Sequence, residues 1–127
     1  MRILIVEDEL IIAIDVEASL SEEGHQVVGI ARESETALGL GQRLRPDLAL
    51  VDVHLVDGET GPEIAAHLTA MGIPVLSMTA NASMLPHGMA GALGVIPKPV
   101  APHVLKGAVK WVAGRDSDPP EALILNR

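Results

Sequence analysis

Residues 48–55 read Leu-Ala-Leu-Val-Asp-Val-His-Leu, an apolar run interrupted by one acid. The run Leu48–Val51 is short and lacks polar alternation, which predicts a strand buried on both faces. Such strands are typical of parallel sheets covered by helices on both sides. The run ends at Asp52, whose flanks are apolar, and a carboxylate in such surroundings needs a partner or a cation.

The rest of the chain repeats this strand pattern and places a helical pattern after each strand. Short apolar runs occur at Ile3–Val6, Val27–Ala31, Val75–Met78 and Gly94–Ile96, and helical periodicity occurs in residues 9–23, 35–45, 61–71, 81–92 and 102–113. Strict alternation predicts an α/β doubly wound fold, with a five-stranded parallel sheet flanked by five helices. Right-handed crossovers then restrict the topology.

Two of the predicted helices carry further signals. Thr60 and Glu63 have the spacing of a capping box at the start of helix 61–71. Helix 9–23 has two apolar stripes, one with Ile12, Ala13, Val16 and Leu20, and a second with Ile11, Ile14 and Ala18. The second stripe either packs beneath a neighbouring helix or forms a protein interface.

Composition limits the class of protein. The chain has 127 residues, enough for one domain, and we expect a domain over 1–114 followed by a flexible tail over 115–127. A net charge of −8 and a single aromatic residue, one Trp, argue against nucleic-acid and membrane-surface partners. The chain has no cysteine, which excludes disulfides and thiolate metal sites. No apolar run is long enough to span a bilayer, and we expect a cytoplasmic location.

Polar side chains stand at the predicted carboxyl ends of four strands, where open parallel sheets bind their ligands. They are Glu7, Asp8, Asp52, Thr79 and Lys98. Clustered carboxylates repel one another without a counter-charge, and hard oxygen ligands at an open site suit Mg²⁺. A carboxylate beside a metal, an ammonium and a hydroxyl is equipped to accept a phosphoryl group as a nucleophile.

Four segments together resemble the receiver domain of response regulators in two-component signalling. They are Ile-Leu-Ile-Val-Glu-Asp-Glu from Ile3, Leu-Ala-Leu-Val-Asp-Val-His-Leu from Leu48, Pro-Val-Leu-Ser-Met-Thr-Ala from Pro74, and Gly-Val-Ile-Pro-Lys-Pro from Gly94. The resemblance covers about residues 1–114 and implies a flavodoxin-like sheet of order 2-1-3-4-5. It further implies that the chain transmits signals in a phosphorelay and is not an enzyme beyond its own phosphotransfer and dephosphorylation.

The resemblance also implies a role for each site residue. Asp52 would accept the phosphoryl group from a phosphohistidine of a sensor kinase or a histidine phosphotransfer protein. Glu7, Asp8, Asp52 and the backbone carbonyl of His54 would bind Mg²⁺, while Thr79 and Lys98 would contact the phosphoryl group. His54 and Asn81 would set the rate of dephosphorylation. The Lys98–Pro99 peptide bond is expected to be cis, and a downstream protein is expected to receive the signal.

The chain departs from the usual family pattern at Val95, where most members have Tyr or Phe. It also has a longer loop before the helix that follows Asp52, and together these features resemble an atypical, stand-alone single-domain subgroup. One alternative is a receiver-like interaction or dimerisation module that works without phosphorylation. A hydrolase with an aspartyl-phosphate intermediate is less favoured, since His54 stands where such enzymes usually have a second aspartate.

Overall fold

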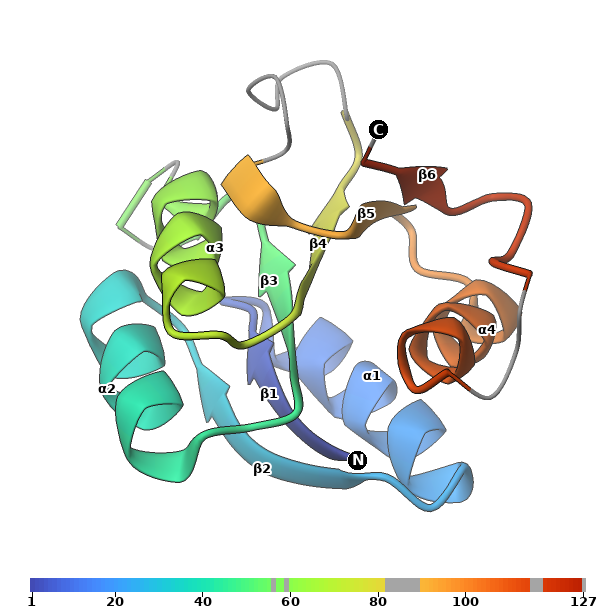
Figure 1. Ribbon diagram of the computed structural model, residues 1–127, viewed down its shortest axis with the longest axis horizontal. Helices are drawn as coiled ribbons and strands as arrows, with labels where there is room; N and C mark the ends of the chain where they lie inside the picture. The colour runs from blue at the N-terminus through green and yellow to red at the C-terminus, as the bar shows by residue number, and fades with distance from the viewer. Residues whose placement is uncertain (56, 59, 82–89, 115–117, 127) are drawn as a thin grey trace.

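The structure is a computed structural model that describes residues 1–55, 57–58, 60–81, 90–114 and 118–126. Strands and helices alternate through most of the chain (Figure 1). The strands are β1 (Arg2–Val6), β2 (Gln26–Ala31), β3 (Leu48–Asp52), β4 (Val75–Thr79), β5 (Gly94–Pro97) and β6 (Ile124–Leu125), and the helices are α1 (Leu10–Glu22), α2 (Ser34–Leu44), α3 (Gly61–Ala70) and α4 (Pro102–Val112). The predicted α/β class and doubly wound architecture are therefore confirmed.

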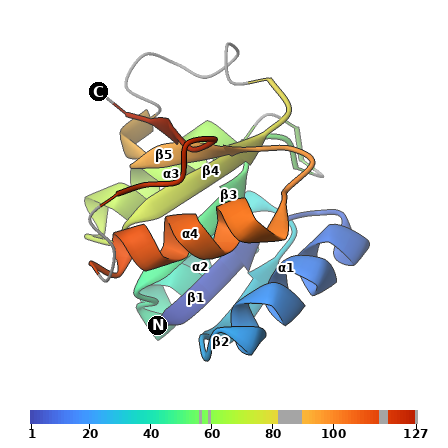
Figure 2. The ribbon, with the colours of Figure 1, turned by 90° about the vertical axis from the view of Figure 1, so that its right-hand side faces the viewer.

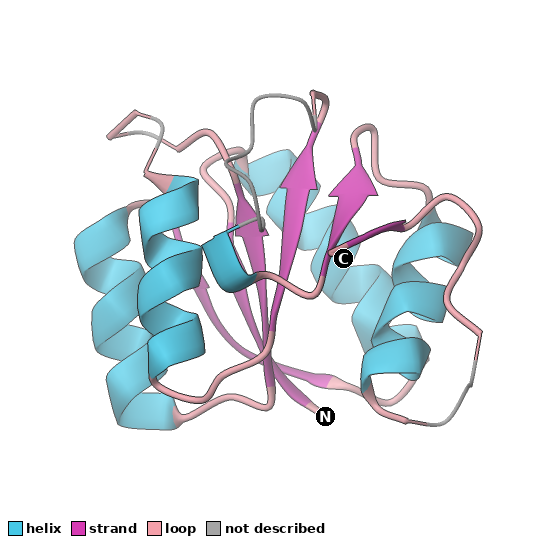
Figure 3. Cartoon of the chain, turned by 45° about the horizontal axis from the view of Figure 1, so that its top comes forward, coloured by secondary structure: helices cyan, strands magenta, loops and turns pink. Residues whose placement is uncertain are grey.

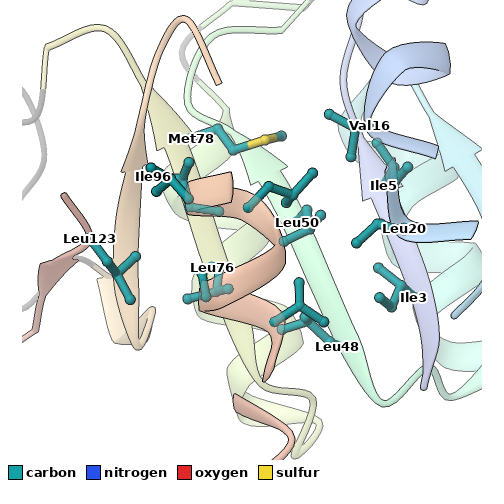
Figure 4. Close-up of a cluster of buried hydrophobic side chains, with 14 of the residues drawn as sticks. Ile3, Ile5, Val16, Leu20, Leu48, Leu50, Leu76, Met78, Ile96 and Leu123 are labelled. Atoms are coloured by element: carbon teal, nitrogen blue, oxygen red, sulfur yellow. The ribbon is translucent and has the colours of Figure 1, made fainter. Parts of the chain in front are cut away.

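The sheet is a central layer with helices on both faces. Its order is β2-β1-β3-β4-β5-β6, and every neighbouring pair except β5–β6 is parallel. Helices α1 and α4 contact each other on one face (Figure 2), and α2 and α3 contact each other on the other. The strands β1, β3 and β4 contribute alternate side chains to a core on each face, as strands buried on both sides must. Figure 4 shows the core under α1 and α4, where Ile3, Leu50 and Met78 point into one cluster.

The predicted five-stranded order 2-1-3-4-5 is right for the parallel strands but omits β6. Ile124–Leu125 pairs antiparallel with β5, so that β5 is not an edge strand. This pairing lies in the segment that the sequence pattern assigns to a flexible tail. Leu123, just before the strand, is buried and packs into the core under α4 (Figure 4). The physical reason is the hydrophobic effect, because Leu123–Leu125 is a run of large apolar residues that pairs with the open edge of β5 beside the core.

The second apolar stripe of α1 was expected either to pack beneath a neighbouring helix or to form a protein interface. Ala13, Val16 and Leu20 are buried against the sheet, as expected for the first stripe. The second stripe does not pack beneath a helix, because Ile11 is 79% exposed and Ile14 is 50% exposed. These two residues and Leu10, which is 59% exposed, form an apolar patch on the surface of α1.

Two smaller expectations have different outcomes. Helix α3 begins at Gly61, its predicted start. The predicted capping box is wrong, because Thr60 makes no side-chain cap bond and its hydroxyl donates to Asp57 Oδ1 at 2.6 Å. The expected helix over residues 81–92 lies mostly outside the described residues. Among the helices that the structure describes, none is long and apolar enough to cross a membrane.

Candidate functional site

The predicted site residues meet at the carboxyl edge of the parallel sheet. Glu7 and Asp8 follow β1, Asp52 and Thr79 end β3 and β4, and Lys98 follows β5. The four strands run in one direction, so these ends lie at one edge (Figure 3). Glu7, Asp52 and Thr79 are almost fully buried, with 0%, 3% and 2% exposure. The structure therefore brings together the five residues that the strand pattern predicts at one edge.

Lys98 is the centre of the site. Its Nζ donates to Asp52 Oδ2 at 2.9 Å and lies 3.0 Å from Glu7 Oε2. One ammonium group is thus shared between two buried carboxylates. The family resemblance predicts a contact of Lys98 with a phosphoryl group, but it does not predict this pairing with Glu7.

The three carboxylates can hold a cation. One carboxylate oxygen from each of Glu7, Asp8 and Asp52 lies within 4.8 Å of the others. Glu7 Oε2 is buried and makes no hydrogen bond, although it is close to Lys98. Burying a carboxylate is costly, the ion pair with Lys98 offsets part of this cost, and a hard cation would offset more of it. The donor set is all oxygen and partly open at Asp8, which fits Mg²⁺.

Charge in this cluster shifts two pKa values. Burial raises the pKa of Glu7 to about 7, and the neighbouring carboxyl of Asp52 adds to the rise, against the opposing effect of Lys98. For Lys98, burial lowers the pKa, but the attraction of the nearby Asp52 and Glu7 carboxylates outweighs burial, so its pKa is raised. The lysine therefore stays charged, while the Glu7 carboxyl resists ionisation in the metal-free protein.

The remaining predicted residues lie next to the cluster. The His54 backbone N–H donates to Asp52 Oδ1 at 3.2 Å, and the side chain of His54 is exposed. The Asn81 backbone N–H donates to Thr79 Oγ1 at 3.1 Å. These bonds fix the directions of the Asp52 carboxylate and the Thr79 hydroxyl. The structure describes no contact that tests the His54 carbonyl as a metal ligand, so that role stays a prediction.

Two residues that shape the loop after Asp52 were not predicted as part of the site. A Cβ on Gly61 would lie 2.3 Å from the Asp52 carbonyl oxygen and 2.5 Å from Val53 Cα, so α3 can begin here only with glycine. Asp57 accepts from the Ser34 backbone N–H at 3.2 Å and from Thr60, which ties the loop to the start of α2. The Asp57–Gly58 pair is a turn signal, but the sequence alone does not show what the turn supports.

The fold agrees with a known protein family. The family model described as "Response regulator receiver domain" matches residues 3–110. The chain belongs to the response-regulator receiver family.

Individual relatives show how far the similarity extends. The chain is 40% identical over 81 residues to the phyllosphere-induced regulator PhyR of Methylorubrum extorquens, covering 62% of this chain and 30% of that protein. It resembles the solved receiver domain of a modulated diguanylate cyclase from Desulfovibrio desulfuricans G20, with a TM-score of 0.80, 30% identity, and 90% and 94% of the two chains covered. It also resembles PhyR of Bartonella quintana, solved in complex with the anti-sigma factor NepR, with a TM-score of 0.56, 37% identity, and 58% and 31% coverage. The match thus spans 30% and 31% of the length of these two PhyR proteins.

Two expectations that came from the family resemblance can now be compared with the structure. The Lys98–Pro99 bond of this receiver is cis, as expected. Val95, at the position where most members have an aromatic ring, is fully buried in β5 and pairs with Ser77 of β4 and Ile124 of β6. No Tyr or Phe exists in the chain to replace the missing ring.

Proposed function

We propose that this receiver works in a phosphorelay and accepts a phosphoryl group on Asp52 from a phosphohistidine of a sensor kinase or a histidine phosphotransfer protein. The observation that carries the proposal is the ammonium of Lys98 held 2.9 Å from the Asp52 carboxylate, beside an acidic cluster suited to a metal. The Asp52 oxygen attacks phosphorus, the bond from phosphorus to the donor nitrogen breaks, and the imidazole leaves.

Each site residue has a role in this proposal. Glu7, Asp8 and Asp52, with the His54 carbonyl, would hold Mg²⁺, which offsets negative charge on the phosphoryl oxygens. Lys98 supplies a second positive charge, 2.9 Å from the Asp52 carboxylate that acts as the nucleophile. The Thr79 hydroxyl, whose oxygen accepts from the Asn81 N–H, donates its proton to a phosphoryl oxygen. His54 and Asn81 govern the access of water to the phosphoaspartate.

The exposed patch on α1 supports a protein as the phosphoryl donor. Leu10 is the second residue after Asp8, so the patch of Leu10, Ile11 and Ile14 begins at the carboxyl edge of the sheet. A groove of about 500 Å³ runs beside it, between α1 and the loop that begins at Lys98. A donor protein seated on this apolar surface would bring its phosphohistidine to Asp52.

The signal then passes to another protein. The chain catalyses only its own phosphorylation and dephosphorylation in this proposal, so its output is binding or onward phosphotransfer. The PhyR protein that was solved with an anti-sigma factor supports a protein target for this receiver too. The net charge of −8 opposes binding to nucleic acid or to an anionic membrane surface, and a cytoplasmic location would suit a kinase partner.

The proposal is tested by the intact mass of the protein after incubation with acetyl phosphate and Mg²⁺. One added phosphoryl group is expected in the wild type, and none in Asp52→Asn or when EDTA removes the metal. Folding of the variant is checked by circular dichroism. An adduct that persists in Asp52→Asn, or a wild type that never gains mass at short times and low temperature, would contradict the proposal.

A phosphorylation-independent interaction module is the second candidate. It is favoured by Val95, because the aromatic ring that most family members have at this position is missing. A partner that binds wild type and Asp52→Asn with equal affinity, with and without acetyl phosphate, would support this function. The intact carboxylate cluster with its bound lysine favours the first candidate.

A further inference from the structure

Residues 118–126 form a strap along the outer edge of β5, and its last part is β6. Leu125 and Ile124 face Gly94 and Val95 in antiparallel register. The Asn126 backbone N–H donates to the Leu93 carbonyl at 3.0 Å. Figure 1 shows β6 alongside β5, at the opposite side of the sheet from β2. The strap therefore occupies hydrogen-bonding groups that β5 would otherwise present at the edge of the sheet.

Two glycines leave the space that the strap fills. A Cβ on Gly94 of β5 would lie 2.9 Å from the Ile124 carbonyl oxygen and 3.4 Å from the Leu123 side chain. A Cβ on Gly107 of α4 would lie 2.7 Å from Pro120 Cγ. Glycine in the interior of a helix lowers its stability, but Gly107 leaves the space in which Pro120 packs against α4.

Two side chains anchor the strap. Leu123 is 5% exposed and belongs to the core cluster with Ile96 and Leu105 (Figure 4). The Asn126 side-chain amide donates to the Ala92 carbonyl at 2.8 Å. The anchors lie on both sides of the short β6 pairing, so the strap is held by packing at one end and by hydrogen bonds at the other.

The edge of β5 needs such a cover. Residues 92–97 carry no charge, and Val95 and Ile96 are fully buried. Proteins keep an exposed apolar edge from pairing with other strands by placing a charge, a bulge or a covering segment there. The other edge, β2, has a register irregularity where it pairs with β1, between Ile3 and Leu4. The β5 edge has the strap instead.

We propose that the β5 edge is a self-association surface, and that the strap closes it in cis against the β5 edge of a second copy. Two identical edges can pair antiparallel about a two-fold axis, which gives a closed dimer with one continuous sheet. The absence of charge in residues 92–97 means that no like charges oppose each other within that pairing. The proposal does not depend on phosphorylation of Asp52, so either proposal can fail alone.

The test uses full-length variants that loosen the strap. Gly107→Ala, Gly94→Ala and Leu123→Ser are compared with Gly39→Ala, a helix glycine of α2 whose Cβ would meet nothing within 4 Å. Hydrogen exchange at the Asn126 amide, which donates to the Leu93 carbonyl, should speed up roughly tenfold or more in the first three variants only. Light scattering after gel filtration should give one chain mass for wild type and Gly39→Ala, and twice that mass for the loosened variants as concentration rises.

A reversible lock makes the test independent of any single substitution. The chain has no cysteine, so Leu93→Cys with Asn126→Cys allows one disulfide between neighbouring positions of β5 and the strap. In the Gly107→Ala background, the oxidised protein should be a monomer and the reduced protein a dimer.

Several results would overturn the proposal. Loosened straps in proteins that stay monomeric would show that the edge does not self-associate. Unchanged exchange in all three variants would show that these contacts do not hold the strap. A wild type that is already a dimer, open-ended aggregation in place of a dimer, or a dimer that survives the oxidised lock would each contradict cis closure.

Discussion

Glu7→Gln should stabilise the metal-free protein at pH 8 and change its stability far less at pH 5. Glu7 is fully buried, and its pKa is raised from 4.5 to about 7, chiefly by burial. At pH values between 4.5 and about 7, Glu7 keeps a proton in the folded protein that it has lost in the unfolded chain. The free energy of unfolding of the wild type therefore falls as pH rises from 5 to 8. Glutamine has nearly the same shape as glutamate and does not titrate, so the free energy of unfolding of the variant does not fall in this way.

The size of the effect follows from the pKa difference. A pKa shift from 4.5 to about 7 lowers the free energy of unfolding by on the order of 3 kcal/mol once Glu7 is ionised in both the folded and the unfolded protein. For a chain of 127 residues this is a melting-temperature difference of roughly 10 °C. The value already contains the favourable ion pair with Lys98, because that contact lowers the pKa of Glu7 against the larger effect of burial.

The assay is thermal or urea unfolding in EDTA at pH 5 and pH 8, with Glu35→Gln as the control for an exposed carboxylate. The difference between the two pH values isolates the titration, since effects of packing cancel. Added Mg²⁺ should stabilise the wild type more at pH 8 than at pH 5, and the variant less than the wild type at pH 8. A Glu7→Gln protein that is destabilised equally at both pH values would refute the reasoning.

Other variants test the loop, the metal cluster and the α1 patch. Gly61→Ala should lower the free energy of unfolding by on the order of 2 kcal/mol and the melting temperature by several degrees, because the added Cβ meets backbone atoms of Asp52 and Val53. The control Gly39→Ala should raise the melting temperature slightly, and equal shifts in the two variants would contradict this reasoning. Asp8→Ala should weaken Mg²⁺ binding, measured by calorimetry, and raise the metal-free melting temperature by relieving repulsion among carboxylates; a lower melting temperature would point to a structural role. Ile11→Ser with Ile14→Ser should slow phosphorylation by a protein donor about tenfold or more but leave phosphorylation by acetyl phosphate unchanged; equal slowing would exclude a docking role.

The parallel strands and the acidic site are predictable from the sequence because both depend on local patterns and on one topological rule. A short apolar run that ends in an acid predicts where a strand stops, and parallel strands bring their carboxyl ends to the same edge. The residue pattern is therefore enough to place Asp52, Thr79 and Lys98 together. It is not enough to show that Asp52 and Glu7 share the Lys98 ammonium, because that sharing depends on distances across the edge.

The strap and the exposed stripe of α1 are beyond the reach of local patterns. Leu123–Leu125 is apolar wherever it packs, but its pairing depends on an open β5 edge and on space beside Gly94 and Gly107. Likewise, Ile11 and Ile14 lie at helical spacing whether or not another helix covers them. In both cases the outcome depends on whether a segment far away in the sequence packs against these residues.

The charges of the site explain why a metal and a phosphoryl group would act together. Three carboxylates face one ammonium, an excess of negative charge, and the pKa of Glu7 is raised chiefly by burial, with a further rise from the neighbouring Asp52 carboxyl. A divalent cation would remove the excess, and a phosphoryl group on Asp52 would restore it and draw Lys98 away from Glu7. Since Val95 provides no ring to carry this change outward, we expect it to pass through the segment of β5 that joins Lys98 to Val95. That expectation predicts faster amide exchange in β5 on phosphorylation than in Asp52→Asn treated in the same way.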